Sequence, residues 1–152
     1  MTSQDPDALQ TFYARQDAWF RGVRSRLLRA MRIGRRQSVL DLGAGTGETL
    51  AELRRRAGGR VVGLDADRAA LSRARGERVQ ARACTLPFAD RTFDLVFTQM
   101  FFLWAKPLDA VLVDIRRVLQ PGAPLIVAAE PDYGGVVSDP PGALQPFADA
   151  LA

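Results

Sequence analysis

Three glycines and one aspartate have the residue types and the spacing of a ligand-binding loop. Gly43, Gly45 and Gly47 alternate between a short apolar run and a helical pattern. Glycines at such a strand-to-helix turn let the backbone bend tightly and let a ligand lie against main-chain atoms. Asp65 ends the next apolar run, 18 residues after Gly47, where a carboxylate can accept both hydroxyls of a ribose. Together these residues predict a site for a ligand that contains adenosine.

The residue after the last glycine narrows the choice of ligand. A dinucleotide-binding fingerprint has a glycine three residues after Gly45, where the pyrophosphate approaches the helix N-terminus. That position is Glu48 here, and its carboxylate would repel a pyrophosphate. The loop therefore disfavours nicotinamide and flavin dinucleotides.

The sequence lacks the side chains that many catalytic mechanisms need. It has no histidine, and Cys84 is its only cysteine. Ser-His and Cys-His catalysis, a disulfide framework and a thiolate metal cluster are therefore excluded, and no metal site is predicted. We interpret Cys84 as a small buried residue. Any reaction here must require little from the protein's side chains.

The elements that must position the loop alternate between strand and helix patterns. Continuous apolar runs, which are typical of parallel strands buried on both faces, cover residues 38–42, 60–65, 78–83, 93–98 and 124–130. Helical periodicity covers residues 48–56, 67–75 and 107–119. One or two further helices are expected over 7–31, with Trp19, Val23 and Leu28 on an apolar stripe of three-to-four spacing. This alternation predicts an α/β fold: a doubly wound, mostly parallel sheet of about five strands with helices on both faces, preceded by N-terminal helices.

The length of 152 residues favours a single domain over residues 1–152. We divide it into an N-terminal helical segment (1–36), the α/β core (37–130) and a proline-rich tail (131–152) that forms a loop and a short helix. No apolar run approaches the roughly 18 residues of a membrane span. The N-terminus is polar and acidic, unlike a secretory signal. A cytoplasmic protein is therefore expected.

Four stretches resemble the signatures of one protein family, in their order and in their spacing. They are VLDLGAGTG at 39–47, VGLD at 62–65, LPFADRTFDLV at 86–96 and RRVLQPG at 116–122. On these residues the chain resembles the class I, Rossmann-like S-adenosylmethionine-dependent methyltransferases. The third stretch is similar to one found in their small-molecule subgroup, the ubiquinone/menaquinone-type enzymes. The resemblance covers residues 38 to about 130.

The resemblance implies S-adenosylmethionine as the cofactor, across the carboxyl ends of the first, second and fourth strands. Asp65 would bind the ribose hydroxyls, with Ala66 beside the adenine. Asp41 would position the loop and the cofactor's amino group, and Gln99 would contact the methionine end. The implied cofactor-binding residues are Asp41, Gly43, Ala44, Gly45, Gly47, Asp65, Ala66, Ala83 and Gln99.

Two departures from the family pattern stand out. Where the family often has an acid that accepts a hydrogen bond from the adenine amine, this sequence has Arg82, which only donates. Main-chain groups and packing at Ala83 are then expected to hold the adenine. The sequence also has no candidate for the final antiparallel pair of strands, which makes residues 125–129 an apolar edge. We expect a shortened or truncated family member whose edge is covered by the tail or by a homodimer.

Methyl transfer from a sulfonium depends mainly on positioning and desolvation, which agrees with the missing catalytic side chains. Trp104, Glu130 and Tyr133 follow the fourth and fifth strands and are the candidate substrate-pocket residues. Trp104 is either a pocket wall or part of the core, and Glu130 and Tyr133 either orient a substrate or form a polar turn. In relatives of this family the N-terminal helices, here residues 1–36, often form a lid.

Two functions follow from the resemblance. The first is a methyltransferase that acts on an unidentified small molecule by in-line transfer. The alternative is a non-catalytic or truncated module of the same fold that binds the cofactor or a protein partner. Eight arginines lie between Arg15 and Arg36. Because they lack interleaved aromatic residues, the solvated face of a helix is favoured over a nucleic-acid partner.

Overall fold

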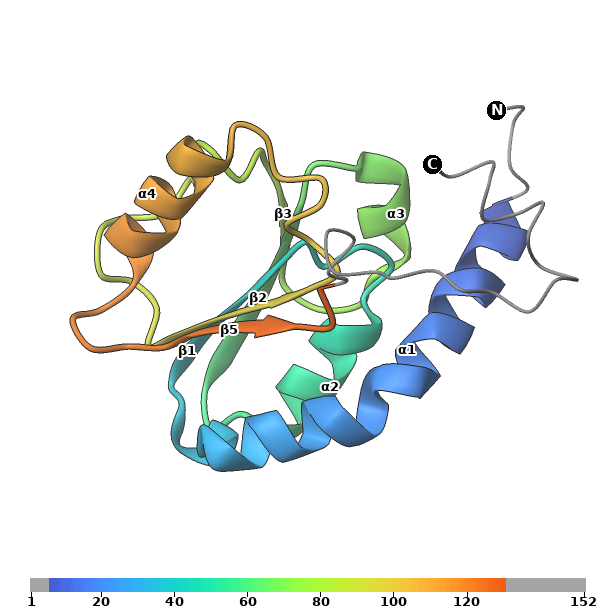
Figure 1. Ribbon diagram of the computed structural model, residues 1–152, viewed down its shortest axis with the longest axis horizontal. Helices are drawn as coiled ribbons and strands as arrows, with labels where there is room; N and C mark the ends of the chain where they lie inside the picture. Colours follow the sequence, from blue (N-terminus) through green and yellow to red (C-terminus); the bar gives the residue numbers. More distant parts are fainter. Residues whose placement is uncertain (1–5, 131–152) are drawn as a thin grey trace, which may run out of the picture.

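The computed structural model describes residues 6–130, in which a parallel sheet of five strands forms the centre (Figure 1). The strands are β1 (Ser38–Leu42), β2 (Arg60–Asp65), β3 (Arg78–Gln80), β4 (Leu95–Gln99) and β5 (Leu125–Ala128). Their order is β3-β2-β1-β4-β5, and every neighbouring pair is parallel. The strand order reverses between β1 and β4, which is where ligands bind in doubly wound folds.

Helices cover both faces of this sheet. They are α1 (Pro6–Ala30), α2 (Glu48–Arg56), α3 (Arg68–Arg73) and α4 (Leu108–Val118), with a short 3-10 turn at Ile33–Arg35. Figure 1 shows α1 and α2 on one side of the sheet and α4 on the other. The buried side chains form two separate clusters, one beneath α1, α2 and α3 and the other beneath α4. The predicted fold class is confirmed.

The structure differs from the expected elements mainly at strand ends. The third strand stops at Gln80 rather than at residue 83, and the fifth stops at Ala128 rather than at residue 130. The fourth begins at Leu95, because Phe93 forms only an isolated bridge with Leu119. The apolar runs are longer than the ladders of hydrogen bonds, since apolar side chains outside the ladders are also half-buried, as at Ala81 and Ala129, or buried, as at Phe93.

Helix α1 is one helix that continues through Gly22, and its inward face differs from the predicted apolar stripe. Trp19 and Val23 were expected on that stripe, but they are 80% and 50% exposed. Asp17 and Arg24 are buried instead, on the same face as Leu28. The predicted stripe is wrong at Trp19 and Val23, because apolar periodicity cannot detect a helix face that contains a buried ion pair.

The α4 face is held to the long connection between β3 and β4 by Arg117. Its guanidinium donates to the carbonyl oxygens of Phe88 (2.7 Å) and Leu86 (2.9 Å). It also pairs with Asp114 (2.6 Å) on its own helix and with Asp90 (2.9 Å) in the connection. These bonds explain how a segment without regular structure is fixed over the sheet.

No helix within residues 6–130 is both long enough and apolar enough to cross a membrane. The same part of the chain contains no group of three histidine, cysteine or carboxylate side chains placed to hold a metal ion.

Candidate cofactor-binding site

The glycine loop connects β1 to α2 at the carboxyl end of the sheet. The amides of Gly43 and Ala44 donate to the carbonyl oxygen of Leu64 (2.8 and 3.0 Å), which folds the loop toward β2. Gly45 has φ +51°, and a side chain added there would meet no atom within 4 Å. Gly47 has φ +93°, and an added Cβ would lie 2.7 Å from the Cβ of Ala74. Gly47 is thus required for packing, whereas Gly45 leaves its backbone open to a ligand.

Asp65, at the end of β2, lies directly beside this loop. One carboxylate oxygen accepts the amide of Gly45 at 2.8 Å, and the other accepts the amide of Asp67 at 2.9 Å. The side chain is therefore aimed at the glycine loop and held from both sides. The structure brings together the aspartate and the glycines that the sequence predicted as one site.

Asp41 is the most unusual group of the site. Asp41 is 1% exposed. Among the described side chains, its Oδ2 is the one buried nitrogen or oxygen atom without a hydrogen-bond partner. Burial raises the pKa of the Asp41 carboxyl to about 8, although the charge of Arg24 opposes this shift. A buried carboxylate oxygen without a partner is costly for the free protein. A ligand that donates a hydrogen bond there would remove this cost.

Arg24 reaches the site from α1 and is 2% exposed. Its guanidinium pairs with Asp17 of the same helix and donates to Glu52 of α2 (2.8 Å) and to the side-chain oxygen of Gln99 at the end of β4 (2.9 Å). Burial by itself lowers the pKa of the Arg24 guanidinium. Its hydrogen bonds to Asp17 and Glu52 raise the pKa by more than burial lowers it, so the pKa lies above its ordinary value. Glu52 also pairs with Arg56 (2.6 Å), and its pKa lies below its ordinary value despite burial, because both arginines bond to it.

Asp41 and Gln99 project from the same face of the sheet. Side chains alternate between the faces along a strand, and Val39 and Phe97 both belong to the cluster beneath α1 and α2. Asp41 and Gln99 each stand two residues later, on the neighbouring strands β1 and β4. The family resemblance implied both Asp41 and Gln99 for the methionine end of the cofactor, but the Arg24 network that lies over them was missed.

The signal that would have revealed this network is a spacing on α1. Asp17, Arg24 and Leu28 are separated by seven and four residues, so they share one helix face. The prediction treated the N-terminal arginines as a solvated face. This is correct for exposed arginines such as Arg21, Arg26 and Arg29 but wrong for Arg24.

The remaining predicted residues lie around the same edge of the sheet in different ways. Ala66 is exposed and Ala83 is half-buried. Trp104 is 80% exposed. Glu130 accepts hydrogen bonds from the backbone amides of Phe101 (2.7 Å) and Phe102 (3.2 Å), so its carboxylate fixes the loop after β4. Tyr133 and the predicted tail at 131–152 lie outside the described residues.

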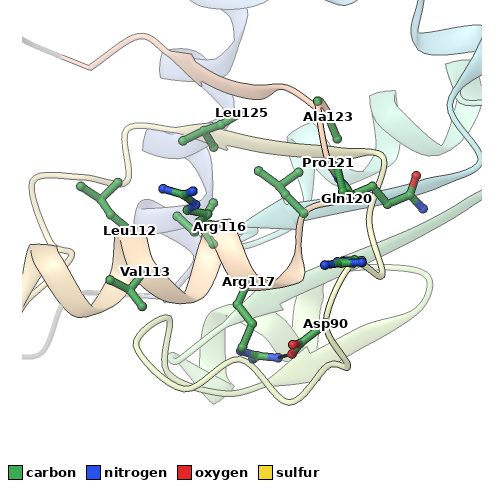
Figure 2. A pocket seen from close by; sticks show the side chains of 13 residues that line it. Asp90, Leu112, Val113, Arg116, Arg117, Gln120, Pro121, Ala123 and Leu125 are labelled. Atoms are coloured by element: carbon green, nitrogen blue, oxygen red, sulfur yellow. Dashed lines mark hydrogen bonds and ion pairs between the residues drawn. The ribbon is translucent and has the colours of Figure 1, made fainter.

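A groove elsewhere on the molecule is unrelated to these residues. Figure 2 shows it between α4 and the turn that leads into β5, with Leu112, Arg116, Pro121 and Leu125 along its walls. This turn lies at the amino end of β5, whereas the glycine loop follows the carboxyl end of β1. The groove contains none of the predicted site residues.

Comparison with known proteins identifies the family. A family model described as "Methyltransferase domain" matches residues 40–127. The chain belongs to this methyltransferase family. Malonyl-[acyl-carrier protein] O-methyltransferase 1 of Coxiella burnetii is 39% identical to it over 89 residues, which are 58% of this chain and 32% of the relative. Ubiquinone/menaquinone biosynthesis C-methyltransferase UbiE of Escherichia coli is 36% identical over 108 residues, which cover 62% of this chain and 43% of that enzyme. The methyltransferase domain thus spans less than half the length of these curated relatives.

Solved structures agree with the family. The complex between the Haloferax volcanii Trm112 methyltransferase activator and a methyltransferase matches with a TM-score of 0.73 and 26% identity, over 85% of this chain and 62% of that chain. A SAM-dependent methyltransferase from Aquifex aeolicus matches with a TM-score of 0.71 over 93% of this chain and 80% of that chain, and its 21% identity supports the fold alone. The predicted family is confirmed, and S-adenosylmethionine is the cofactor that it implies.

The residues present fit this cofactor. Its ammonium group can donate to the unpartnered Oδ2 of Asp41, which removes the cost of that buried oxygen. Its ribose hydroxyls can donate to Asp65, which already faces the glycine loop. A Cβ added at Gly45 would meet no atom within 4 Å, so the backbone of the loop is open to a ligand beside Asp65. The methyltransferase domain therefore offers Asp41 as an acceptor for the ammonium group and Asp65 as an acceptor for the ribose hydroxyls.

Proposed function

We propose that this protein transfers a methyl group from S-adenosylmethionine to a small molecule. The proposal rests above all on Asp41, whose buried carboxylate oxygen lacks a partner within the described residues. This oxygen lies on the same face of the sheet as Gln99, one strand away, and its strand leads directly into the glycine loop. A structural aspartate would be paired, whereas a ligand-binding aspartate is left with a free acceptor until the ligand arrives.

When bound, the cofactor would supply a methyl group on its sulfonium sulfur: the acceptor nucleophile would bond to the methyl carbon in line as the carbon–sulfur bond breaks, and S-adenosylhomocysteine would leave. Asp41 and Gln99 hold the methionine end, Asp65 holds the ribose, and Ala66 and Ala83 flank the adenine. Gly43, Ala44, Gly45 and Gly47 form the turn on which this ligand lies. The protein's contribution is to orient the reacting atoms and to exclude water, and no proton carrier is required on the cofactor side.

The acceptor side is formed by the loop that follows β4. The carboxylate of Glu130 is engaged by the amides of Phe101 and Phe102, so we assign it to holding this loop in place rather than to removing a proton. The ring of Phe101 lies against Gly43, since a Cβ added at Gly43 would be 2.6 Å from that ring. An apolar wall of this kind suits an apolar acceptor. Trp104, Tyr133 and a lid formed by residues 1–36 remain our proposals for the rest of the pocket.

The names of the relatives suggest acceptors to test. One relative is named for malonyl-[acyl-carrier protein] and another for ubiquinone and menaquinone biosynthesis. A malonyl thioester and a reduced quinone are therefore the first acceptors to offer. An activator partner is a further proposal, because one structural neighbour was solved with one.

The assembly and location are proposals as well. β5 is an edge strand of the described sheet, and Val127 on it is 46% exposed. An apolar edge of this type is usually covered, and we propose that a homodimer or a further segment of chain covers it. We also propose that the protein forms one domain and acts in the cytoplasm.

The experiment that tests the function is calorimetric titration with S-adenosylmethionine and S-adenosylhomocysteine. We expect saturable binding to the wild type and its loss in Asp65→Ala. Asp90→Ala is the matched control, because Asp90 is an exposed aspartate that pairs with Arg117 on the α4 face. A folded wild type that binds neither ligand would refute the proposal. Binding without transfer to any acceptor would favour the alternative, a non-catalytic module of the same fold.

A further inference from the structure

Arg24 makes more bonds than charge neutralisation requires. A guanidinium has five N–H donors, and this one makes four hydrogen bonds and one further ion-pair contact. Nε donates to Glu52, Nη1 donates to Asp17 and Gln99, and Nη2 contacts Asp17 (3.2 Å) and Glu52 (2.7 Å). Asp17 and Glu52 already balance the charge of Arg24, with Arg56 as a second partner of Glu52. The bond to the neutral amide of Gln99 adds nothing to this balance.

The bond to Arg24 fixes which way the Gln99 amide faces. A guanidinium can only donate hydrogen bonds, so the atom of Gln99 that faces it must be the amide oxygen. This argument fixes the orientation of the amide from its hydrogen-bond partner. The NH2 group of Gln99 then faces away from Arg24. Within residues 6–130 this NH2 group makes no hydrogen bond.

A donor and an acceptor are thus left without partners on neighbouring strands. Gln99 offers an N–H, and Asp41 offers a carboxylate oxygen from the same face of the sheet. An amino acid zwitterion has the complementary pair, a carboxylate that accepts and an ammonium that donates. The family resemblance implies that the methionine end of the cofactor lies here, but it implies no role for Arg24.

We propose that Arg24 is a positioning residue, which holds the Gln99 amide so that its NH2 group faces the carboxylate of the cofactor's methionine moiety. This inference rests on the proposed function, because it requires that the site binds S-adenosylmethionine. Helix α1 thereby takes part in cofactor binding without touching the cofactor. Its buried face selects for the amino acid end of the ligand rather than for the adenosine end.

Two ligands separate this role from a merely structural one. S-adenosylhomocysteine has the amino acid moiety, whereas 5′-methylthioadenosine has the same adenosine and sulfur but lacks that moiety. Calorimetry with both ligands is carried out on wild type, Gln99→Met, Arg24→Lys and the double variant. Arg24→Lys keeps a cation for Asp17 and Glu52 but lacks the planar fork that holds Gln99. Arg56→Met is the control, because Arg56 pairs with Glu52 but does not reach Gln99.

We expect Gln99→Met and Arg24→Lys each to weaken S-adenosylhomocysteine binding by about tenfold or more, the usual effect of losing a hydrogen bond to a charged group. Binding of 5′-methylthioadenosine should change less than about twofold. The double variant should bind S-adenosylhomocysteine no more weakly than Gln99→Met alone, since Arg24 acts through Gln99. Arg56→Met should leave the ratio of the two affinities unchanged.

A parallel loss for both ligands, or additive losses in the double variant, would overturn the inference while the proposed function stands. Gln99→Met leaves the ion pairs of Arg24 in place, so it can overturn the inference even if Arg24→Lys does not fold. An unchanged affinity ratio in Gln99→Met would overturn the inference. A wild type that binds neither ligand would instead remove the proposed function and the inference together.

Discussion

Two arginines anchor the two faces of the sheet, and they differ in what they leave unsatisfied. Arg24, on the α1 face, is 2% exposed and bonds to two acids and to Gln99. Arg117, on the α4 face, has a side chain that is 33% exposed and bonds to two acids and to backbone carbonyls. Both join a helix to segments far away in the sequence. Among the side chains that the structure describes, only the Arg24 network lies next to a buried polar atom without a partner, Oδ2 of Asp41.

This difference distinguishes a network that only stabilises the fold from one that lies beside a proposed binding site. On the α4 face, the donors of Arg117 go to acceptors in the same chain, so the network is complete without a ligand. On the α1 face, Asp41 keeps an unused acceptor in a buried place, which lowers the stability of the free protein. A binding site commonly includes such a group, because the ligand supplies the missing partner. Substitutions on the α1 face and on the α4 face test this difference between the Arg24 and Arg117 networks.

The largest effect is expected from removing Arg24. Arg24→Met leaves Asp17 and Glu52 buried without their common partner, and breaking a buried ion pair typically costs about 3–5 kcal/mol. Urea denaturation should show this loss as a lower midpoint. The same measurement on Arg56→Met, which removes a partner that is 23% exposed, should show a much smaller loss. Equal losses in the two variants would contradict the special role of the Arg24 network.

Asp41→Asn should raise stability and weaken cofactor binding. The pKa of Asp41 is raised to about 8 in the folded protein by burial, so between about pH 4 and pH 8 the folded state keeps a proton that the unfolded state releases. Stability of the wild type therefore falls as the pH rises through this window. Asparagine does not titrate, and it should add on the order of 2–4 kcal/mol near pH 7 and almost nothing near pH 4.

Thermal denaturation of both proteins from pH 4 to pH 8 measures this gain. Asp41→Asn should also weaken ligand binding, because asparagine cannot neutralise the ammonium group of S-adenosylhomocysteine. Calorimetry should show weaker binding by the more stable variant. A variant that gained stability and kept its affinity would mean that Asp41 does not contact the cofactor.

Glu130→Ala should disturb the acceptor side and leave the cofactor side intact. Its carboxylate accepts from the amides of Phe101 and Phe102, and hydrogen bonds to a charged group contribute roughly 1.5–3 kcal/mol. We expect a loss of about that size in urea denaturation. Affinity for 5′-methylthioadenosine should change little, because the residues that we propose for the ribose and the adenine lie at the ends of β2 and β3 and in the glycine loop. A large loss of that affinity would show that Glu130 belongs to the cofactor site.

The fold could be predicted from local patterns in the sequence, and the polar residues proposed for the site were placed relative to the same patterns. Five apolar runs define the strands, and the glycines and Asp65 occupy fixed places relative to them. Parallel strands bring their carboxyl ends to one edge, so Asp41, Asp65 and Gln99 could be placed together from the order of the strands.

The sequence could not predict contacts that join distant segments through single side chains. Arg24 lies 28 residues from Glu52 and 75 residues from Gln99, and only its spacing from Asp17 and Leu28 distinguishes it from the exposed arginines of the same helix. The role of Glu130 was missed for the same reason, because its partners are the amides of Phe101 and Phe102, 29 and 28 residues earlier. Apolar periodicity also misplaced Trp19 and Val23, since it assumes that a buried helix face is apolar.

The smallest effect is expected on the α4 face. Arg117→Met removes bonds to Leu86, Phe88, Asp90 and Asp114, but these are partly exposed, and such pairs contribute roughly 1 kcal/mol. We expect a loss of that size in urea denaturation and no change in calorimetric affinity for S-adenosylhomocysteine. Asp114 remains bonded to the amide of Leu86, so the connection between β3 and β4 keeps one anchor. A clear drop in affinity would mean that the α4 face also shapes the cofactor site, and the contrast between the two arginines would then fail.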